Sequence, residues 1–201
     1  MISKKIGFIL TLFFVIISCS TYKKAIKTNP EKRLKDSLAF ELCQIYGSDQ
    51  GVRDMKLLTT TKIMKFLPNI DTISFNKLVK FVKKNGYPTK KILGEDNFSF
   101  ECVESAGIAV LLHNPHRLVN EKKYLDLFLN EVEKGNFKRK SLALVLDKYY
   151  WVRRDKFGNR KLLYGSQFGK PCFKHRAKSD SVRAIIGLKP LTNSDFMKCK
   201  K

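Results

Sequence analysis

Apolar residues recur at helical spacing through most of this chain. The first stripe lies between residues 31 and 55 and consists of Leu34, Leu38, Leu42, Ile45 and Val52. This period belongs to an α-helix with one buried face, so we expect a long first helix that begins just after Pro30. Gly47 and Gly51 weaken the second half of this helix and permit a kink there.

The same pattern predicts four further helices, over residues 71–84, 98–113, 119–134 and 140–148. Asp71 or Thr72 is expected to cap the second helix. Within the third, residues 106–112 are apolar on nearly every side. We therefore expect this segment to be the most deeply buried part of the chain.

The polarity pattern changes after residue 148. Aromatic and β-branched residues at 149–153 and 161–167 flank a polar segment that contains Gly158-Asn159. Such a pattern is typical of two strands joined by a tight turn. We therefore predict an α+β fold: a mainly helical single domain of about five helices around residues 106–112, with a small β-hairpin near the C-terminal third.

The beginning of the chain has a different pattern. Lys4 and Lys5 precede an uncharged apolar run at residues 6–17. At ~1.5 Å per residue, a helix of that length falls well short of a ~30 Å hydrocarbon core, so we interpret residues 1–18 as an export signal. The polar, lysine-rich residues 19–30 are expected to form a flexible tether, and residues 31–201 a single globular domain.

The apolar run ends in Ile16-Ile17-Ser18-Cys19. This segment resembles the lipobox of bacterial lipoproteins. The resemblance implies lipidation of Cys19, cleavage before it and acylation of the new N-terminus. Two or more acyl chains hold a protein stably, so it also implies an anchor in the cell membrane or the outer membrane, with the domain facing the periplasm or the exterior. The alternative is an ordinary signal peptide whose cysteine is incidental.

Charge narrows the possible partners. The formal net charge is +22, and lysines are spread along the chain instead of gathering with arginines on one element. The spread favours a solvated lysine-rich surface, and the alternative is binding of anionic lipid headgroups or envelope polymers. Export makes nucleic acid a poor candidate partner.

The cysteines besides Cys19 bear on redox chemistry and metals. They are Cys43, Cys102, Cys172 and Cys199. An oxidising compartment permits disulfides, and the sequence leaves all possible pairings open. The spacing does not match that of zinc sites, and histidines are few, so we predict neither a metal nor a cofactor.

Several short motifs occur in a defined order. They are Asp49-Gln50-Gly51-Val52-Arg53, Gly86-Tyr87-Pro88, Leu112-His113, Asp147-Lys148, Tyr164-Gly165-Ser166-Gln167, Arg183 and Gly187-Leu188. Together they resemble the landmarks of a family of uncharacterised bacterial proteins that carry a domain of unknown function. That family has glutamine, arginine and threonine where this chain has Leu112, Lys148 and Ser166. The resemblance spans about residues 38–191 and points to a site, not to a reaction.

The motifs contain the candidate site residues. Asp49 lies on the apolar stripe of the first helix, where a carboxylate is costly unless paired, and Arg53 is one turn away. His113 ends the buried helix and can act as a general acid or base, oriented by Asp49 or Asp147. The candidate binding residues are Arg53, Tyr164 and Gln167. In the alternative interpretation, Asp49 and Arg53 form a structural ion pair and His113 caps its helix.

Two functions remain open at this point. One is a membrane-anchored envelope protein without catalysis that binds an anionic or protein partner. The other is a lipid-anchored enzyme, such as a hydrolase, that uses His113 with Asp49 or Asp147. Convergence of these side chains in an open cleft would favour the enzyme, and a closed, dry cluster would favour a binding or structural role.

Overall fold

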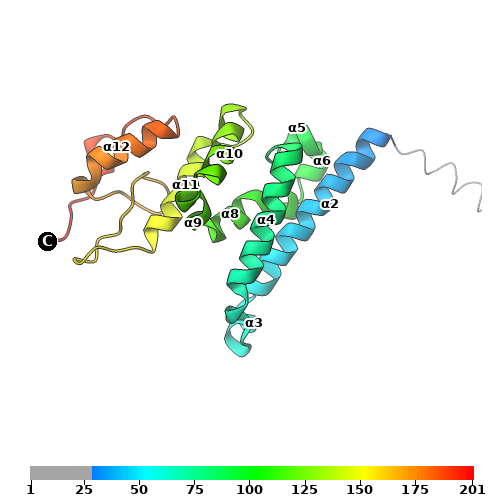
Figure 1. Ribbon diagram of the computed structural model, residues 1–201, viewed down its shortest axis with the longest axis horizontal. Helices are drawn as coiled ribbons and strands as arrows, with labels where there is room; N and C mark the ends of the chain where they lie inside the picture. Colours follow the sequence, from blue (N-terminus) through cyan, green and yellow to red (C-terminus); the bar gives the residue numbers. More distant parts are fainter. Residues whose placement is uncertain (1–28) are drawn as a thin grey trace, which may run out of the picture.

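Helices make up the regular structure of residues 29–201, the part of the chain that this computed structural model describes. Eleven α-helices and no β-strand occur in this part (Figure 1). The predicted export signal, the lipidation site at Cys19 and most of the predicted tether lie outside the described residues. None of the described helices is long and apolar enough to cross a bilayer.

The first predicted helix is present but shorter than expected. Helix α2 (Pro30–Gln50) begins with proline in its first turn, and the side chain of Asn29 accepts a hydrogen bond from the amide of Glu31 at 3.0 Å. The chain then tightens into a 3₁₀ turn, η1 (Gly51–Arg53), because glycine at position 51 does not favour continuing the α-helix. The buried residues of α2 are Ala39, Leu42, Ile45 and Asp49.

A long helical hairpin follows from this break. Helix α3 (Met55–Thr60) and the 3₁₀ turn η2 (Ile63–Lys65) form its end, and α4 (Leu67–Asn85) returns along α2 (Figure 1). Helix α4 begins a turn earlier than predicted, with Pro68 in its first turn, so Asp71 and Thr72 lie inside the helix and cap nothing. It ends at Gly86, whose φ of 86° suits glycine.

The third predicted helix is broken into short pieces. It is divided into α7 (Glu101–Glu104) and α8 (Ala106–His113), and two short helices that were not predicted, α5 (Lys90–Leu93) and α6 (Glu95–Phe98), precede these. A disulfide between Cys43 and Cys102 joins α2 to α7. Helix α8 contacts α2, α4, α7 and α11, and its buried residues are Ala106, Gly107, Val110 and Leu111. The other three residues of 106–112 are partly exposed, so the segment lies in the core as predicted but is not buried on every side.

The next predicted helix is also split. Helices α9 (Pro115–Asn120) and α10 (Lys122–Glu133) are separated at Glu121, and α11 (Arg139–Trp151) follows. Beyond a long loop come η3 (Phe173–His175), α12 (Arg176–Ile185) and η4 (Asn193–Asp195). A second disulfide, Cys172–Cys199, closes the C-terminal region.

The predicted α+β fold and its β-hairpin are wrong. The aromatic residues 149–151 complete helix α11, and residues 151–167 contain only an isolated antiparallel bridge between Arg154 and Arg160. The expected second strand has its amide groups engaged elsewhere, because the amides of Leu163 and Tyr164 donate to the Asp147 carboxylate. The amide of Lys161 still donates to the backbone oxygen of Arg153, but with the amides of Leu163 and Tyr164 taken, a ladder of strand hydrogen bonds does not continue.

Candidate functional site

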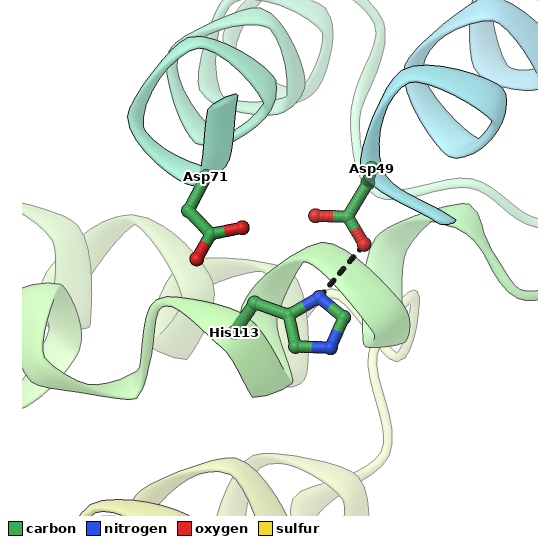
Figure 2. A group of neighbouring side chains, drawn as sticks. All are labelled: Asp49, Asp71 and His113. Atoms are coloured by element: carbon green, nitrogen blue, oxygen red, sulfur yellow. Dashed lines mark hydrogen bonds and ion pairs between the residues drawn. The ribbon is translucent and has the colours of Figure 1, made fainter. Parts of the chain in front are cut away.

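Three helices and a 3₁₀ turn bring four polar side chains together. Asp49 comes from the last turn of α2, Arg53 from the end of η1, Asp71 from the second turn of α4 and His113 from the last residue of α8. Figure 2 shows Asp49, Asp71 and His113 pointing toward one another from their separate helices. The predicted pairing of Asp49 with His113 is therefore present.

Asp49 and His113 form the closest contact of this cluster. Nδ1 of His113 lies 2.7 Å from Oδ2 of Asp49, which also accepts a hydrogen bond from Nε2 of Gln50 at 2.7 Å. The Asp49 side chain is fully buried, whereas that of His113 is 28% exposed. A buried carboxylate therefore holds a partly exposed imidazole in a fixed orientation.

Arg53 makes a second contact with the same ring nitrogen. Its Nε lies 3.0 Å from Nδ1 of His113. This nitrogen carries either a proton or a lone pair, so it cannot donate to Asp49 and accept from Arg53 at once. The shorter contact with a buried carboxylate fits a protonated Nδ1 that donates to Asp49. In the neutral ring this tautomer leaves Nε2 as the basic nitrogen.

Arg53 pairs mainly with Asp71. The Nη2 atom of Arg53 is hydrogen-bonded to Oδ1 of Asp71, and it lies 3.7 Å from Oδ1 of Asp49. This second oxygen of Asp49 is buried and accepts no hydrogen bond within the described residues. The sequence-based ion pair of Asp49 with Arg53 is thus the weaker of the two pairs, and Arg53 bridges the carboxylates of α2 and α4.

Two opposing effects act on the pKa of the Asp71 carboxyl group. Burial raises its pKa above the ordinary value, and the positive charge of Arg53 opposes that rise. Sequence reasoning placed Asp71 as a helix cap and missed it as a site residue. The available signal was its spacing, because Asp71 precedes the buried Phe75 and Leu78 by four and seven residues and so lies on the buried face of α4.

The cluster also contains ligand types that bind divalent cations. One ligand atom from each of Asp49, Asp71 and His113 lies within 4.8 Å of the others. The guanidinium of Arg53 contacts all three side chains. A metal ion would have to displace this guanidinium. In the described residues, Arg53 supplies the positive charge between the two carboxylates.

An open pocket of about 490 Å³ borders the cluster. It is lined by Arg53, Asp71, Leu112, His113, Pro115, His116, Lys148, Tyr149, Val152 and Arg153. Lys148 lies over the rings of Trp151 and Phe168, and Arg153 stacks on Tyr149. Neither Lys148 nor Arg153 has a carboxylate partner among residues 29–201. The wall of the pocket formed by residues 148–153, the end of α11 and the two residues after it, therefore carries uncompensated positive charge.

Asp147 does not join this cluster. Its carboxylate is fully buried and accepts hydrogen bonds from the amides of Leu163, Tyr164 and Ser166 at 2.9–3.0 Å. These bonds use both oxygens, so Asp147 holds the loop after α11 and has no contact with His113. The prediction of an Asp147–His113 pair is not supported by this geometry.

The other predicted binding residues lie at a separate pocket. Gln167 is exposed and Tyr164 is buried, and both line a cavity of about 440 Å³ with Arg183. The Arg183 guanidinium donates to the backbone oxygens of Tyr164 and Lys189. Of the predicted binding residues, only Arg53 therefore lies at the Asp49–His113 cluster.

Comparison with protein-family models, with curated proteins and with solved structures finds no match for this chain. The resemblance to a family with a domain of unknown function stays a prediction.

Proposed function

We propose that this is an exported, lipid-anchored protein that binds a small anionic group in the pocket beside His113. The observation that carries the binding proposal is the pocket wall formed by residues 148–153, where Lys148 and Arg153 have no carboxylate partner in the described part of the chain. Unpaired cations at the edge of an open pocket attract anions and can donate hydrogen bonds to them.

Export and anchoring are supported by the N-terminal pattern. Lys4 and Lys5, the apolar run and the Ile16-Ile17-Ser18-Cys19 segment have the order of a lipoprotein leader. The two disulfides, Cys43–Cys102 and Cys172–Cys199, are of a kind that persists in oxidising compartments. The test is mass spectrometry of the protein from a bacterial membrane fraction. A diacyl or triacyl group on Cys19 is expected, and a chain that retains residues 1–18 without fatty acid would refute it.

Anion binding is tested with inorganic phosphate as the probe. We expect isothermal titration of residues 29–201 to show binding that weakens at least about tenfold, or ~1.4 kcal/mol, in the double variant Lys148→Gln/Arg153→Gln. Loss of both cations removes the attraction while the Asp49–His113 contact stays. The matched control is Lys83→Gln/Lys84→Gln, two exposed lysines in the last turn of α4. Equal phosphate affinity in the two double variants would refute the assignment.

A second candidate function is favoured by the Asp49–His113 contact. With Nδ1 donating to Asp49, the neutral ring presents Nε2, which has no hydrogen-bond partner in the described residues, beside a pocket lined by His113. Such a nitrogen can take a proton from a water molecule that attacks a bound ester or phosphoester. The proton then passes to the leaving group. This is the chemistry of a hydrolase without a protein nucleophile.

His113→Gln separates catalysis from a structural role. The expected result for a hydrolase is a loss of about 10²-fold or more in hydrolysis of 4-nitrophenyl phosphate, with a thermal midpoint close to that of the parent protein. A large fall in thermal midpoint, with no hydrolysis by the parent, would show instead that His113 and Asp49 lock α8 to α2.

A further inference from the structure

The end of the α2–α4 hairpin exposes apolar side chains that no other part of the described structure covers. Residues 54–66, which we name the tip, contain α3 and η2 and project beyond the neighbouring helices (Figure 1). Their main contacts are with one another, with η1 and with the start of α4. No residue of α3 or η2 is buried. The tip therefore has no core of its own.

Large apolar side chains of the tip face water. Met55 is 71% exposed, Met64 62% and Phe66 56%, and Leu57 is exposed as well. Ile73, on the adjoining turns of α4, is also exposed. Exposed apolar side chains that are grouped in this way often form the contact surface for a membrane or for another protein.

The tip is positively charged, which favours an anionic partner over a neutral one. Lys56, Lys62 and Lys65 are exposed and form no ion pair with any residue of the described chain. The acidic residue of the tip, Asp54, is occupied as the cap of α3, where its side chain accepts from the amide of Leu57 at 3.1 Å. The tip thus combines exposed apolar groups with uncompensated positive charge.

The polar groups of the tip are satisfied internally. The hydroxyls of Thr59, Thr60 and Thr61 each donate to a backbone oxygen in the preceding turn, at 2.6–2.8 Å. Hydroxyl groups that are already hydrogen-bonded cost less to remove from water. The three consecutive threonines therefore do not oppose transfer of the tip into a less polar medium.

The base of the tip is held in place by the cluster described above. The ion pair of Arg53 with Asp71 joins the two chain segments that enter and leave the tip. The apolar side chains are thus presented at the end of a braced hairpin and not on a loose loop. Arg53 also lines the pocket beside His113, so the base of the tip and one wall of that pocket share this residue.

We propose that the tip inserts into the headgroup region of a bilayer that contains anionic lipids. Lysines beside exposed methionine, leucine and phenylalanine match an anionic surface that covers an apolar interior. This contact is noncovalent and does not depend on Cys19. It is also separate from anion binding by Lys148 and Arg153.

The proposal is tested with residues 29–201, which contain the whole described core and both disulfides and lack Cys19. Co-sedimentation is measured with vesicles of phosphatidylglycerol and phosphatidylethanolamine and with vesicles of phosphatidylcholine alone. Binding is expected for the anionic vesicles, at least about tenfold stronger than for phosphatidylcholine, and it should weaken as salt is raised. Absence of binding to the anionic vesicles, or equal binding to both kinds, would overturn the proposal.

Paired variants locate the contact. Met64→Ser/Phe66→Ser removes apolar groups from the tip, and Leu34→Ser/Phe40→Ser removes equally exposed ones from α2. Lys56→Gln/Lys62→Gln/Lys65→Gln removes the charge of the tip, and Lys77→Gln/Lys83→Gln/Lys84→Gln removes the same charge from α4. Each tip variant should lose about tenfold in vesicle affinity, and each control less than about twofold. Equal losses in tip variants and controls would refute docking through the tip.

Two spectroscopic measurements complete the test: circular dichroism checks that the variants fold, and tryptophan fluorescence locates the contact. None of the substituted tip residues is buried, so circular dichroism should show an unchanged thermal midpoint. A Phe66→Trp variant should show a blue shift of tryptophan fluorescence with anionic vesicles, beyond any shift of the parent protein from Trp151. Binding without that extra shift would place the contact elsewhere and reject the proposal.

Discussion

At the scale of single residues, buried carboxylates explain much of this structure. Asp49, Asp147 and Glu131 are all at most 1% exposed, and each solves the problem of a buried charge differently. Asp49 is hydrogen-bonded to the imidazole of His113, and Asp147 accepts hydrogen bonds from backbone amides of a loop. Glu131 accepts hydrogen bonds from groups on two neighbouring segments. Glu131 accepts from the amide of Tyr87, from Asn136 and from Lys134, each at 2.8 Å.

Glu131 gives a pH-dependent prediction. Burial acts to raise the pKa of its carboxyl, but the hydrogen bonds from Lys134, Asn136 and Tyr87 outweigh burial and hold that pKa below its ordinary value of 4.5. The folded protein thus binds this proton less tightly than the unfolded chain. The stabilising contribution is present above pH ~4.5 and is lost as the pH falls below it.

Urea unfolding at several pH values between about 3 and 7 measures this effect. Glu131→Gln should lower the free energy of unfolding at neutral pH by about 1–3 kcal/mol and should reduce its decline toward acid. Glu133→Gln, on the exposed side of the same helix, is the matched control and should leave both unchanged. An acid decline of the same steepness in Glu131→Gln and the parent would contradict the role given to Glu131.

At the scale of elements, the helical pattern predicted where helices occur better than where they break. The predicted helix at residues 98–113 is interrupted at Ser105, and the one at 119–134 at Glu121. Interruptions of this kind let short helices turn around α8, and no local period reports them. The missing hairpin has a different cause, since the buried Asp147 carboxylate accepts the amides that a second strand would need.

Asp147→Asn tests the account of the loop. An asparagine has one acceptor oxygen, and its amide group would face one of the three loop amides, so we expect a loss of about 2–4 kcal/mol in the free energy of unfolding. Amide hydrogen exchange should show lost protection at Leu163, Tyr164 and Ser166 while α8 stays protected. Asp126→Asn is the control, because Asp126 is half exposed and pairs only with Lys122. A loss below about 0.5 kcal/mol in Asp147→Asn would argue against this role.

At the scale of the whole molecule, the proposed activities lie close together. The Asp49–Arg53–Asp71–His113 cluster joins α2, α4 and α8, the pocket lies on its α11 side, and the tip projects from its base. The cluster therefore serves both as a brace for the hairpin and as one wall of the pocket.

The sequence by itself determined the features that depend on neighbours along the chain. These are the position of most helices, the place of residues 106–112 in the core and the presence of Asp49 on an apolar stripe, while export stays a prediction. A helical period and a local charge pattern are enough for such predictions, because the interactions involved span three or four residues.

Only the tertiary structure decided which distant groups meet. Asp71 became the main partner of Arg53, Asp147 was taken by a loop, and Gln167 lay at another pocket. The contacts formed here join groups 16 or more residues apart, and Gln167 is separated from residues with which it was expected to share a site. A buried carboxylate must find a partner, but the packing of the helices decides which donor reaches it, and that choice is not encoded in local periodicity.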